Sequence, residues 1–348
     1  MELADLTQDY RALSARRALT ELVICKAISA PGELAGYVRA RLRHSPHFDL
    51  VQKAVVGGLV TTTDGVDGLQ PLKAAWADAL RRKTIIGRLP VRYVPSATAI
   101  TVVGPDDPPG FVAESAPIPV FRPSLTDASL TPGKIAEIVS YATELLRATR
   151  GRVAQMVERD LTLRAAIGED SALLDAQAGV IGGRPASVLA GQTALGGGSP
   201  SEIEEDIRLL LAEVRDGYAV APAFVGAPSA ARYLATLRNS DGARVFPDAE
   251  AYGGSLLGVP LLVTAGAPAG ILVLIDGDSL LVVDDDLELD TSTQGAFQFE
   301  TEPTSGAASS VSLWQTNSVG LKLQRFISWR LAWPDGAAFI GLPTNSPA

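Results

Sequence analysis

Residues that carry catalytic and metal-binding chemistry are scarce in this chain. Its 348 residues include one cysteine, Cys25, and two histidines, His44 and His47. A single cysteine excludes an internal disulfide and a cysteine-based metal cage, and Cys25 lies in the apolar run LVIC, where we expect a small buried residue. Two histidines in one HSPH segment make a weak metal site. The sequence therefore favours a protein that is not an enzyme and needs no cofactor.

Motifs of the common enzyme classes are missing as well. There is no G-x-S-x-G elbow, and the glycine-rich segment LGGGSPSE, residues 195–202, lacks the G-K-[ST] of a nucleotide loop, so we interpret it as a flexible linker with a helix cap. The aspartates between Asp276 and Asp286 lack the spacing of an EF-hand loop and are interpreted as a solvated acidic edge. A soluble α/β hydrolase or binding protein remains a distant alternative, which the absence of a histidine base from the body of the chain disfavours.

Long uninterrupted hydrophobic runs are also lacking, although 47% of the residues are hydrophobic and a large core can be buried. The uncharged stretch from Gly253 to Ile275 is broken by prolines and glycines, so it predicts two buried strands joined by an AGAPAG turn rather than a membrane helix. Acidic residues follow Met1, where a signal peptide would carry basic ones. We therefore expect a soluble protein, cytoplasmic where it is made, without a membrane partner.

Charge is unevenly distributed along the chain. Residues 1–90 hold 13 Lys and Arg against 9 Asp and Glu, a balance of +4, and the remaining residues hold 17 against 30, so that the net charge is −9. Because neutralised phosphates supply most non-specific affinity for nucleic acids, the acidic body argues against a dedicated DNA-binding protein. The N-terminal part is thus weakly basic and the rest of the chain acidic, for which simple solvation of the surface is one explanation.

Residues 1–83 carry short helical stripes separated by turns. The stripes are Leu6, Tyr10 and Leu13; Leu34, Val38 and Leu42; and Leu72, Trp76, Ala79 and Leu80. Short amphipathic helices of this kind bury little on their own, so this segment is expected to need a partner surface.

Residues 85–121 alternate β-branched runs with proline and glycine. The runs are IIGRLPVRYVP, TAITVVG, the turn PDDPPG and FVAESAPIPVF. They predict an extended β-hairpin with a proline-rich tip and without an apolar layer of its own.

The longest helical pattern begins at Thr143, after a strand predicted over residues 135–141. One face is predicted to carry Val153, Met156, Val157 and Leu161, and the opposite face Arg152, Gln155, Arg159 and Thr162. The arginines of this segment, which could meet acidic groups of a neighbouring hairpin, are Arg147, Arg150, Arg152, Arg159 and Arg164. A solvated helix surface is the alternative.

Glycine-rich residues 179–198 mark a change in composition and a predicted domain boundary. The following Ser199-Pro200-Ser201-Glu202 predicts a capping box, before a helix with the stripe Ile203, Ile207, Leu211 and Val214. A second helix after Pro228 and strands in LLGVPLLVTA, ILVLIDG and SLLVVDDDLELD complete an α/β unit.

The strongest pattern is a period-2 alternation from Leu321 to Trp333. Six of the seven odd positions are apolar, against two of the six even ones, which predicts a long strand with one buried face. Pro334-Asp335-Gly336 then predicts a turn, after which residues 337–340 can return as a neighbouring strand.

Several of these segments, in this order, resemble the major capsid proteins of tailed phages, the family with the HK97-like fold. The segments are GFVAESAP at 110–117, the helix from Thr143, GVPLLVTAGAP at 258–268, SLWQTN at 312–317 and RFISWR at 325–330. The resemblance implies an α+β HK97-like capsid fold. Its predicted parts are an N-terminal arm at 1–84, an extended hairpin (E-loop) at 85–130, a peripheral (P) domain with a spine helix at 131–180, an axial (A) domain at 181–290 and P-domain return strands at 291–348.

The resemblance also implies a function. Copies of the chain would assemble as hexamers and pentamers into an icosahedral phage head, the virion capsid, around double-stranded DNA; an encapsulin-like nanocompartment or a gene-transfer-agent shell is the alternative. Expected partners are other copies of the chain, portal, scaffolding or cement proteins, and DNA contacted non-specifically at the inner face. Because about 50 residues before the VVGGLVTTTDG loop are too few for a scaffolding domain, we expect the arm to be retained. Candidate inter-subunit contacts are Asp106, Asp107, Glu114, Arg147, Arg152, Arg159, Trp314 and Asn317.

Some members of the family join their subunits by an isopeptide bond between a hairpin lysine and a P-domain asparagine, assisted by a carboxylate. Asn317 and Glu114 are conceivable counterparts here, but no lysine lies between Lys83 and Lys134. Arginine cannot replace it as a nucleophile because its guanidinium stays protonated. We therefore expect a shell without covalent cross-links.

Overall fold

The structure is a computed structural model in which the chain divides into two compact units. Unit 1 comprises Met1–Arg88, Lys134–Gly168 and Asp286–Arg325, and unit 2 comprises Leu89–Gly133, Glu169–Asp285 and Phe326–Ala348. The residues that the structure describes are 3–29, 33–56, 70–96, 99–103, 125–148, 152–197, 199–214, 219–298 and 310–343.

Four long elements contain residues of both units. They are β4 (Gly133–Ala142), α7 (Arg152–Leu174), β10 (Leu280–Ser292) and β13 (Ser318–Leu331). Three of them belong to one four-stranded sheet in the order β1-β10-β13-β4. The strand and helix predicted after residue 131 are thus confirmed as β4 and α7, and the alternating C-terminal strand as β13, whose odd positions from Leu321 to Trp329 are buried.

Unit 1 is mainly helical. Its elements are α1 (Leu3–Ile28), α2 (Leu34–Leu42), α3 (Phe48–Val56), α4 (Gln70–Arg81), α5 (Ile85–Arg88), α6 (Thr143–Ala148), β11 (Ala296–Phe297) and β12 (Val311–Ser312). Its hydrophobic core combines the N-terminal helices with α7, β10 and β13: Leu22, Trp76, Val157 and Leu321 are all nearly or fully buried. Tight burial of large side chains of this kind is the main source of folding free energy.

This core corrects the prediction that the N-terminal segment has too little to bury without a partner. The surface that covers α1 and α4 comes from later parts of the same chain, which no local pattern in residues 1–83 could reveal. The stripe Leu72, Trp76, Ala79 and Leu80 is confirmed as buried. So is Cys25, and burial, together with the nearby Glu21, raises the pKa of its thiol to about 12, so that it stays protonated at neutral pH.

The face assigned to α7 was partly wrong. Val153, Val157 and Leu161 are buried as predicted, but Met156 is 45% exposed and Thr162 is 3% exposed, the reverse of the expectation. Thr162 is accommodated in the core because its hydroxyl donates to the Glu158 carbonyl one turn earlier, at 2.5 Å.

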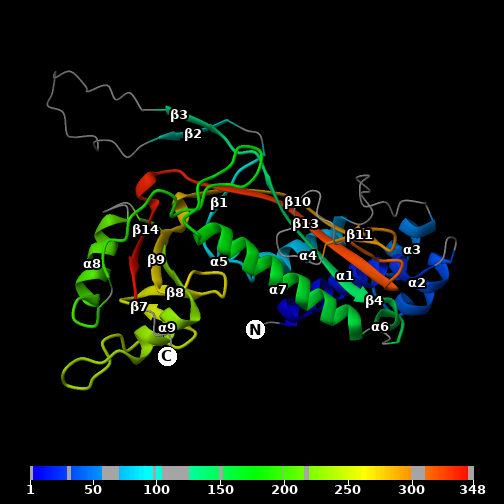
Figure 1. Cartoon of the computed structure of the whole chain (residues 1–348), viewed down its shortest axis with the longest axis horizontal. Helices are drawn as coiled ribbons and strands as arrows, with labels where there is room; N and C mark the ends of the chain where they lie inside the picture. The colour runs from blue at the N-terminus through cyan, green and yellow to red at the C-terminus, as the bar shows by residue number, and fades with distance from the viewer. Residues whose placement is uncertain are drawn as a thin grey trace. The chain divides into compact units, whose positions relative to one another are not determined.

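Unit 2 contains a six-stranded mixed sheet in the order β14-β9-β5-β8-β7-β6, with α8 and α9 packed against it (Figure 1). The elements are β5 (Pro222–Gly226), β6 (Ala249–Glu250), β7 (Gly253–Leu256), β8 (Val259–Val263), β9 (Ile271–Asp276), β14 (Ala337–Gly341), α8 (Ile203–Glu213) and α9 (Pro228–Thr236). Short 3-10 turns, Gly277–Ser279 and Pro334–Gly336, precede β10 and β14. The predicted strands β8 and β9 are present, although β5 lies between them.

The return strand after Pro334 pairs differently from the prediction. β14 is not a neighbour of β13 but lies antiparallel to β9, with Phe339 opposite Val273. Leu195 and Gly196, predicted as flexible linker, are tied to β14 by hydrogen bonds from the Leu195 amide to the Phe339 carbonyl and from the Gly341 amide to the Gly196 carbonyl.

The predicted capping box does not form. Helix α8 begins at Ile203, with Glu202 at the N-cap and no side-chain capping bond, and the Ser199 hydroxyl binds the Glu202 carboxylate at 2.9 Å. Asp276 was also misassigned to a solvated edge, since it is fully buried and its Oδ1 accepts a hydrogen bond from the Ala221 amide at 3.0 Å.

The extended hairpin is confirmed in part. Ile85–Arg88 is helix α5 rather than a strand, and β1 (Arg92–Tyr93) pairs in parallel with β10. β2 (Ala99–Val103) pairs antiparallel with β3 (Leu125–Ser129), which follows the segment 111–121 where the descending strand was predicted. Residues 104–124, and with them the proline-rich tip and the GFVAESAP segment, lie outside the described residues.

Candidate functional site

The arginines of α6 and α7 do not form one uniform surface. Arg159 is exposed and has no charged or hydrogen-bonding partner among the residues that the structure describes. Arg147 is exposed on α6, and its Nη2 donates to the Ile28 carbonyl at 3.5 Å. Arg164 binds Asp160 at 3.2 Å and Glu137 at 3.3 Å within unit 1, so its charge is already compensated. Arg152 opens α7, but its side chain lies outside the described part.

Apolar side chains lie on the exposed side of α7 beside Arg159. Met156 is 45% and Leu163 48% exposed, and these residues follow a helical spacing of 3 and 4 with Arg159. An exposed surface that mixes apolar side chains with an uncompensated arginine is typical of protein interfaces. The sequence prediction missed this surface because it placed Met156 in the core.

A carboxyl and a phenol beside this part of α7, Glu137 and Tyr141, have environments that favour their protonated forms. Burial raises the pKa of Glu137, with Arg164 opposing the effect, and burial followed by the charge of Asp160 raises the pKa of the Tyr141 phenol. Tyr141 therefore stays protonated and donates to Asp160 Oδ2 at 3.1 Å.

Trp314 and Asn317 lie in a turn between β12 and β13. Trp314 is 77% exposed, which is unusual for a side chain with so large an apolar surface. Asn317 has a φ of +47°, a left-handed conformation that asparagine tolerates better than most residues. Its carbonyl accepts from the Thr143 amide at 2.9 Å, and its side-chain amide donates to Glu144. The structure thus brings Asn317 next to Glu144, 173 residues away in sequence, which local patterns could not indicate.

The remaining candidate contacts, Asp106, Asp107 and Glu114, fall outside the described residues. Their proposed meeting with the arginines of α7 therefore stays a prediction.

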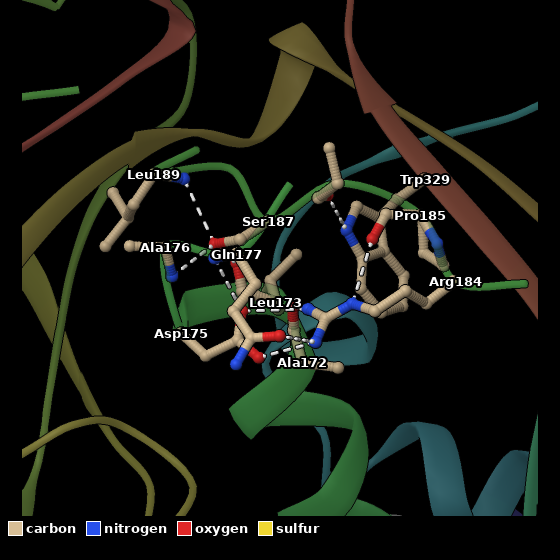
Figure 2. A network of polar contacts seen from close by, with 11 residues as sticks. Ala172, Leu173, Asp175, Ala176, Gln177, Arg184, Pro185, Ser187, Leu189 and Trp329 are labelled. Carbon is tan, nitrogen blue, oxygen red and sulfur yellow. Dashed lines mark hydrogen bonds and ion pairs between the residues drawn. The ribbon is translucent and has the colours of Figure 1, made fainter. Parts of the chain in front are cut away.

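In unit 2, a loop at residues 175–192 is fixed at the end of α7 by polar contacts, which Figure 2 shows. Arg184 makes a two-pronged ion pair with Asp175, at 2.8 Å for each prong, and donates to the Ala172 carbonyl at 3.1 Å. Ser187 caps the helix further, because its hydroxyl donates to the Leu173 carbonyl at 2.8 Å and accepts from the Ala176 amide at 3.1 Å. These groups satisfy carbonyls that the last turn of a helix leaves unpaired.

Trp329 connects the same loop to β13. Its indole Nε1 donates to the Ala186 carbonyl at 2.9 Å (Figure 2). A close approach also requires glycine at position 133, where a Cβ atom would lie 2.7 Å from the Gly183 carbonyl oxygen. The loop is therefore built into unit 2, although composition alone predicted a connector.

A cavity of about 800 Å³ lies between this loop, residues 130–133 and the end of β13, all within unit 2. Beside it the loop exposes Val180 and Ile181, the latter completely. The volume of this cavity falls within the range of ligand pockets, and its rim is partly apolar.

The described residues include no group of three or more histidine, cysteine, aspartate or glutamate side chains that could hold a metal ion. Among the described residues, each helix is too short or too polar to cross a lipid bilayer.

Comparisons with known proteins agree with this fold. Residues 77–306 match the model of the phage capsid family, and this match covers more than half of the chain. The chain therefore belongs to the phage capsid family. A curated relative, the capsid polyprotein of Pseudomonas phage PAJU2, is 28% identical over 318 residues, covering 84% of this chain and 47% of the relative. The chain thus spans about half the length of this relative.

Solved structures confirm the HK97-like fold. A structure of Microbacterium phage Oxtober96 has a TM-score of 0.56 at 17% identity, covering 74% of this chain and 90% of that chain. A structure of Gordonia phage Cozz has a TM-score of 0.54 at 17% identity, covering 75% and 87%. The capsid of an empty GTA particle has a TM-score of 0.54 at 13% identity, covering 75% and 90%.

Proposed function

We propose that this chain is a structural major capsid protein, whose copies assemble as hexamers and pentamers into a closed icosahedral shell around double-stranded DNA. The observation that carries the proposal is the family match, which runs from residue 77 to residue 306 and so includes parts of both units. The function is geometric rather than catalytic, and it requires surfaces on which copies cover one another.

The exposed apolar side chains support assembly. Trp314 in unit 1 and Tyr252 and Ile181 in unit 2 are each more than three quarters exposed. Burying large aromatic and aliphatic side chains at an interface supplies much of the free energy of association. On this proposal, the exposed side of α7 and the hairpin β2–β3 form contacts between copies. Each copy carries the predicted arm, P and A domains, with β14 joined to the A-domain strand β9. Portal, scaffolding or cement proteins join the shell.

A gene-transfer-agent shell is the second candidate. The similarity to the capsid of a GTA particle favours it, and the fold serves both kinds of shell equally. Sequencing the nucleic acid inside purified particles distinguishes them, since a phage head contains its own genome and a gene-transfer particle contains host fragments.

Negative-stain microscopy of the expressed chain tests the proposal. We expect closed, uniform particles or ring-shaped capsomers. A field of dispersed single chains at every salt and protein concentration tried would refute the assembly function.

The chemistry of the hairpin adds a second test. Because no lysine lies between Lys83 and Lys134, particles boiled in detergent and reductant should run as single chains of 36.3 kDa. A ladder of heavier bands containing a lysine–asparagine linkage by mass spectrometry would show that the shell is cross-linked after all.

A further inference from the structure

A second cavity, in unit 1, is lined by basic and hydroxyl side chains. It has a volume of about 270 Å³ and lies among α1, the turn that follows α2, and the start of α7. Its polar lining consists mainly of Ser14, Arg17, Glu21, Arg41, His44 and Ser45. Drug-sized ligands occupy cavities of roughly 300–1,000 Å³, so this one suits a single small group rather than a large molecule.

The carboxylate in this cavity is already paired. Glu21 accepts from Arg41 Nη1 at 3.2 Å, and Arg41 Nη2 donates to the Leu146 carbonyl at 2.8 Å. Glu158, behind the lining, is paired with Arg16 at 3.3 Å. Burial raises the pKa of Glu158, and the charges of both Arg16 and Arg17 oppose this effect, so Glu158 interacts electrostatically with Arg17 as well.

Arg17 is held by a neutral group. With its amide oriented by its hydrogen bonds, Gln155 accepts from Arg17 Nη1 at 3.1 Å and Nε at 3.3 Å. The guanidinium is exposed and fixed in direction, and it forms no direct ion pair with a carboxylate among the described residues, although the charge of Glu158 lies near enough to act on it. A guanidinium that is already fixed in this way loses little side-chain entropy when it binds an anion, which favours binding.

The turn after α2 contributes further positive charge. Arg43 Nε donates to His44 Nε2 at 2.9 Å, so the neutral imidazole of His44 carries its proton on Nδ1 and can donate from there. Arg39 lies one turn before Arg43 on α2, both are exposed, and neither is paired with a carboxylate in the described part of the chain. The uncompensated charge thus extends beyond the cavity along α2.

We propose that this cavity binds a phosphodiester group of a nucleic-acid strand, with Arg17 as the charged ligand in the lining and Arg43, which is hydrogen-bonded to the lining residue His44, as a second positive charge next to it. Arginine forks match the oxygens of phosphate, and the Ser45 hydroxyl and His44 can supply further donors. A nucleic acid is favoured over an acidic peptide because the exposed arginines continue along α2, which fits a polyanion with evenly spaced charges. The inference rests on the proposed function, since a capsid shell encloses DNA, and it identifies where unit 1 meets that DNA.

The test measures binding of a fluorescein-labelled 20-base-pair DNA duplex to the full-length chain, in the smallest species that it forms, over a series of salt concentrations. Each lost phosphate contact should reduce the slope of log affinity against log salt by about 0.9. We expect this reduction for Arg17→Ala and for Arg43→Ala. Gln155→Glu should act like Arg17→Ala, because it keeps both arginines but gives Arg17 a carboxylate partner. Arg244→Ala, an equal loss of charge at an exposed position in unit 2, is the matched control and should leave the slope unchanged.

The inference would be overturned if the salt slope stayed at the wild-type value in Arg17→Ala, Arg43→Ala and Gln155→Glu. It would also be overturned if Arg244→Ala reduced the slope as much as these variants do. So would displacement of the duplex by inorganic phosphate at equal phosphate concentration, which indicates a free-anion site, or by a decaglutamate peptide at equal charge, which indicates a protein partner. Thermal unfolding of each variant checks that the fold is intact. Microscopy separates the two proposals: shells with unchanged salt slopes refute only this site, whereas altered slopes without shells refute only the capsid function.

Discussion

The N-terminal helices of unit 1 and the loop at 175–192 of unit 2 are both fixed in place, although the sequence predicts loose organisation for both. The two segments are held by different interactions. The helices are held by apolar burial against segments that follow more than 60 residues later, such as Val157 on α7 and Leu321 on β13. The loop is held by an ion pair, two helix-capping contacts and an indole hydrogen bond. Apolar burial and polar capping differ in size and in solvent dependence, so the two regions should respond differently to substitution.

The largest expected effect compares two tryptophans. Trp76→Ala removes a fully buried indole from the core of unit 1 and should lower the free energy of unfolding by about 3–5 kcal/mol. Trp314→Ala is the control, because its side chain is 77% exposed and its loss should change stability by less than about 0.5 kcal/mol. Urea denaturation followed by far-ultraviolet circular dichroism measures both. Equal destabilisation by the two changes would contradict the assignment of the core.

A smaller effect is expected in the loop. Arg184→Ala should cost about 1–2 kcal/mol, since it removes a partly buried ion pair and leaves helix carbonyls unsatisfied. The change should appear locally, as faster proteolytic cleavage between residues 175 and 192. Arg208→Ala serves as control, because the Arg208–Glu205 pair is well exposed and follows an ordinary i,i+3 spacing. If Arg208→Ala increased cleavage between residues 175 and 192 as much as Arg184→Ala does, the contacts of Arg184 would not be what fixes this loop.

A third prediction concerns pH and belongs to unit 1. Burial raises the pKa of Glu21 above the ordinary value of 4.5, with Arg41 opposing the shift. Because the folded state binds this proton more tightly than the unfolded chain does, the corresponding stability is present below pH 4.5 and is lost as pH rises through the raised pKa. The free energy of unfolding of wild type, relative to Glu21→Gln, should therefore fall as pH increases from about 4 to 7. A difference that stays constant with pH would contradict the burial of this carboxyl.

The smallest effect on stability is expected on the exposed side of α7. Arg159→Glu should change the unfolding free energy by less than about 0.5 kcal/mol, because this side chain has no partner in the described part of the chain. It should nevertheless reduce the yield of particles if this surface contacts another copy. Arg208→Glu, an exposed charge reversal in unit 2, provides the comparison. Equal particle yields from the two variants and wild type would exclude Arg159 from the interface.

The sequence was informative where one element carries its own pattern. The alternation from Leu321 to Trp329, the stripe of α4 and the helix after Pro228 were predicted correctly, since burial follows the period of each element. The pattern is weaker at its ends: Leu331 and Trp333 are half-buried, and in α8 Leu210 is buried in place of the predicted Leu211.

Prediction from the sequence failed where an element is positioned by residues that are distant in the sequence. The pairing of β14 with β9, the covering of α1 by α7 and β13, and the two-pronged contact of Arg184 with Asp175 depend on tertiary placement, which periodicity does not encode.

The candidate contacts show the same limit. Exposure of Trp314 and Arg159 agrees with an interface role, whereas the contact of Asn317 with Glu144 could not have been expected from residues so far apart in sequence. Met156 was not predicted to be exposed, because an apolar side chain within a helical stripe is assigned to the core by default.

Light scattering coupled to size-exclusion chromatography tests the central claim, that copies of this chain cover one another in a closed shell. The account predicts that the wild-type chain elutes as particles or capsomers whose mass is a large multiple of 36.3 kDa. A stable, well-folded species of 36.3 kDa, unchanged by protein concentration or salt, would contradict it.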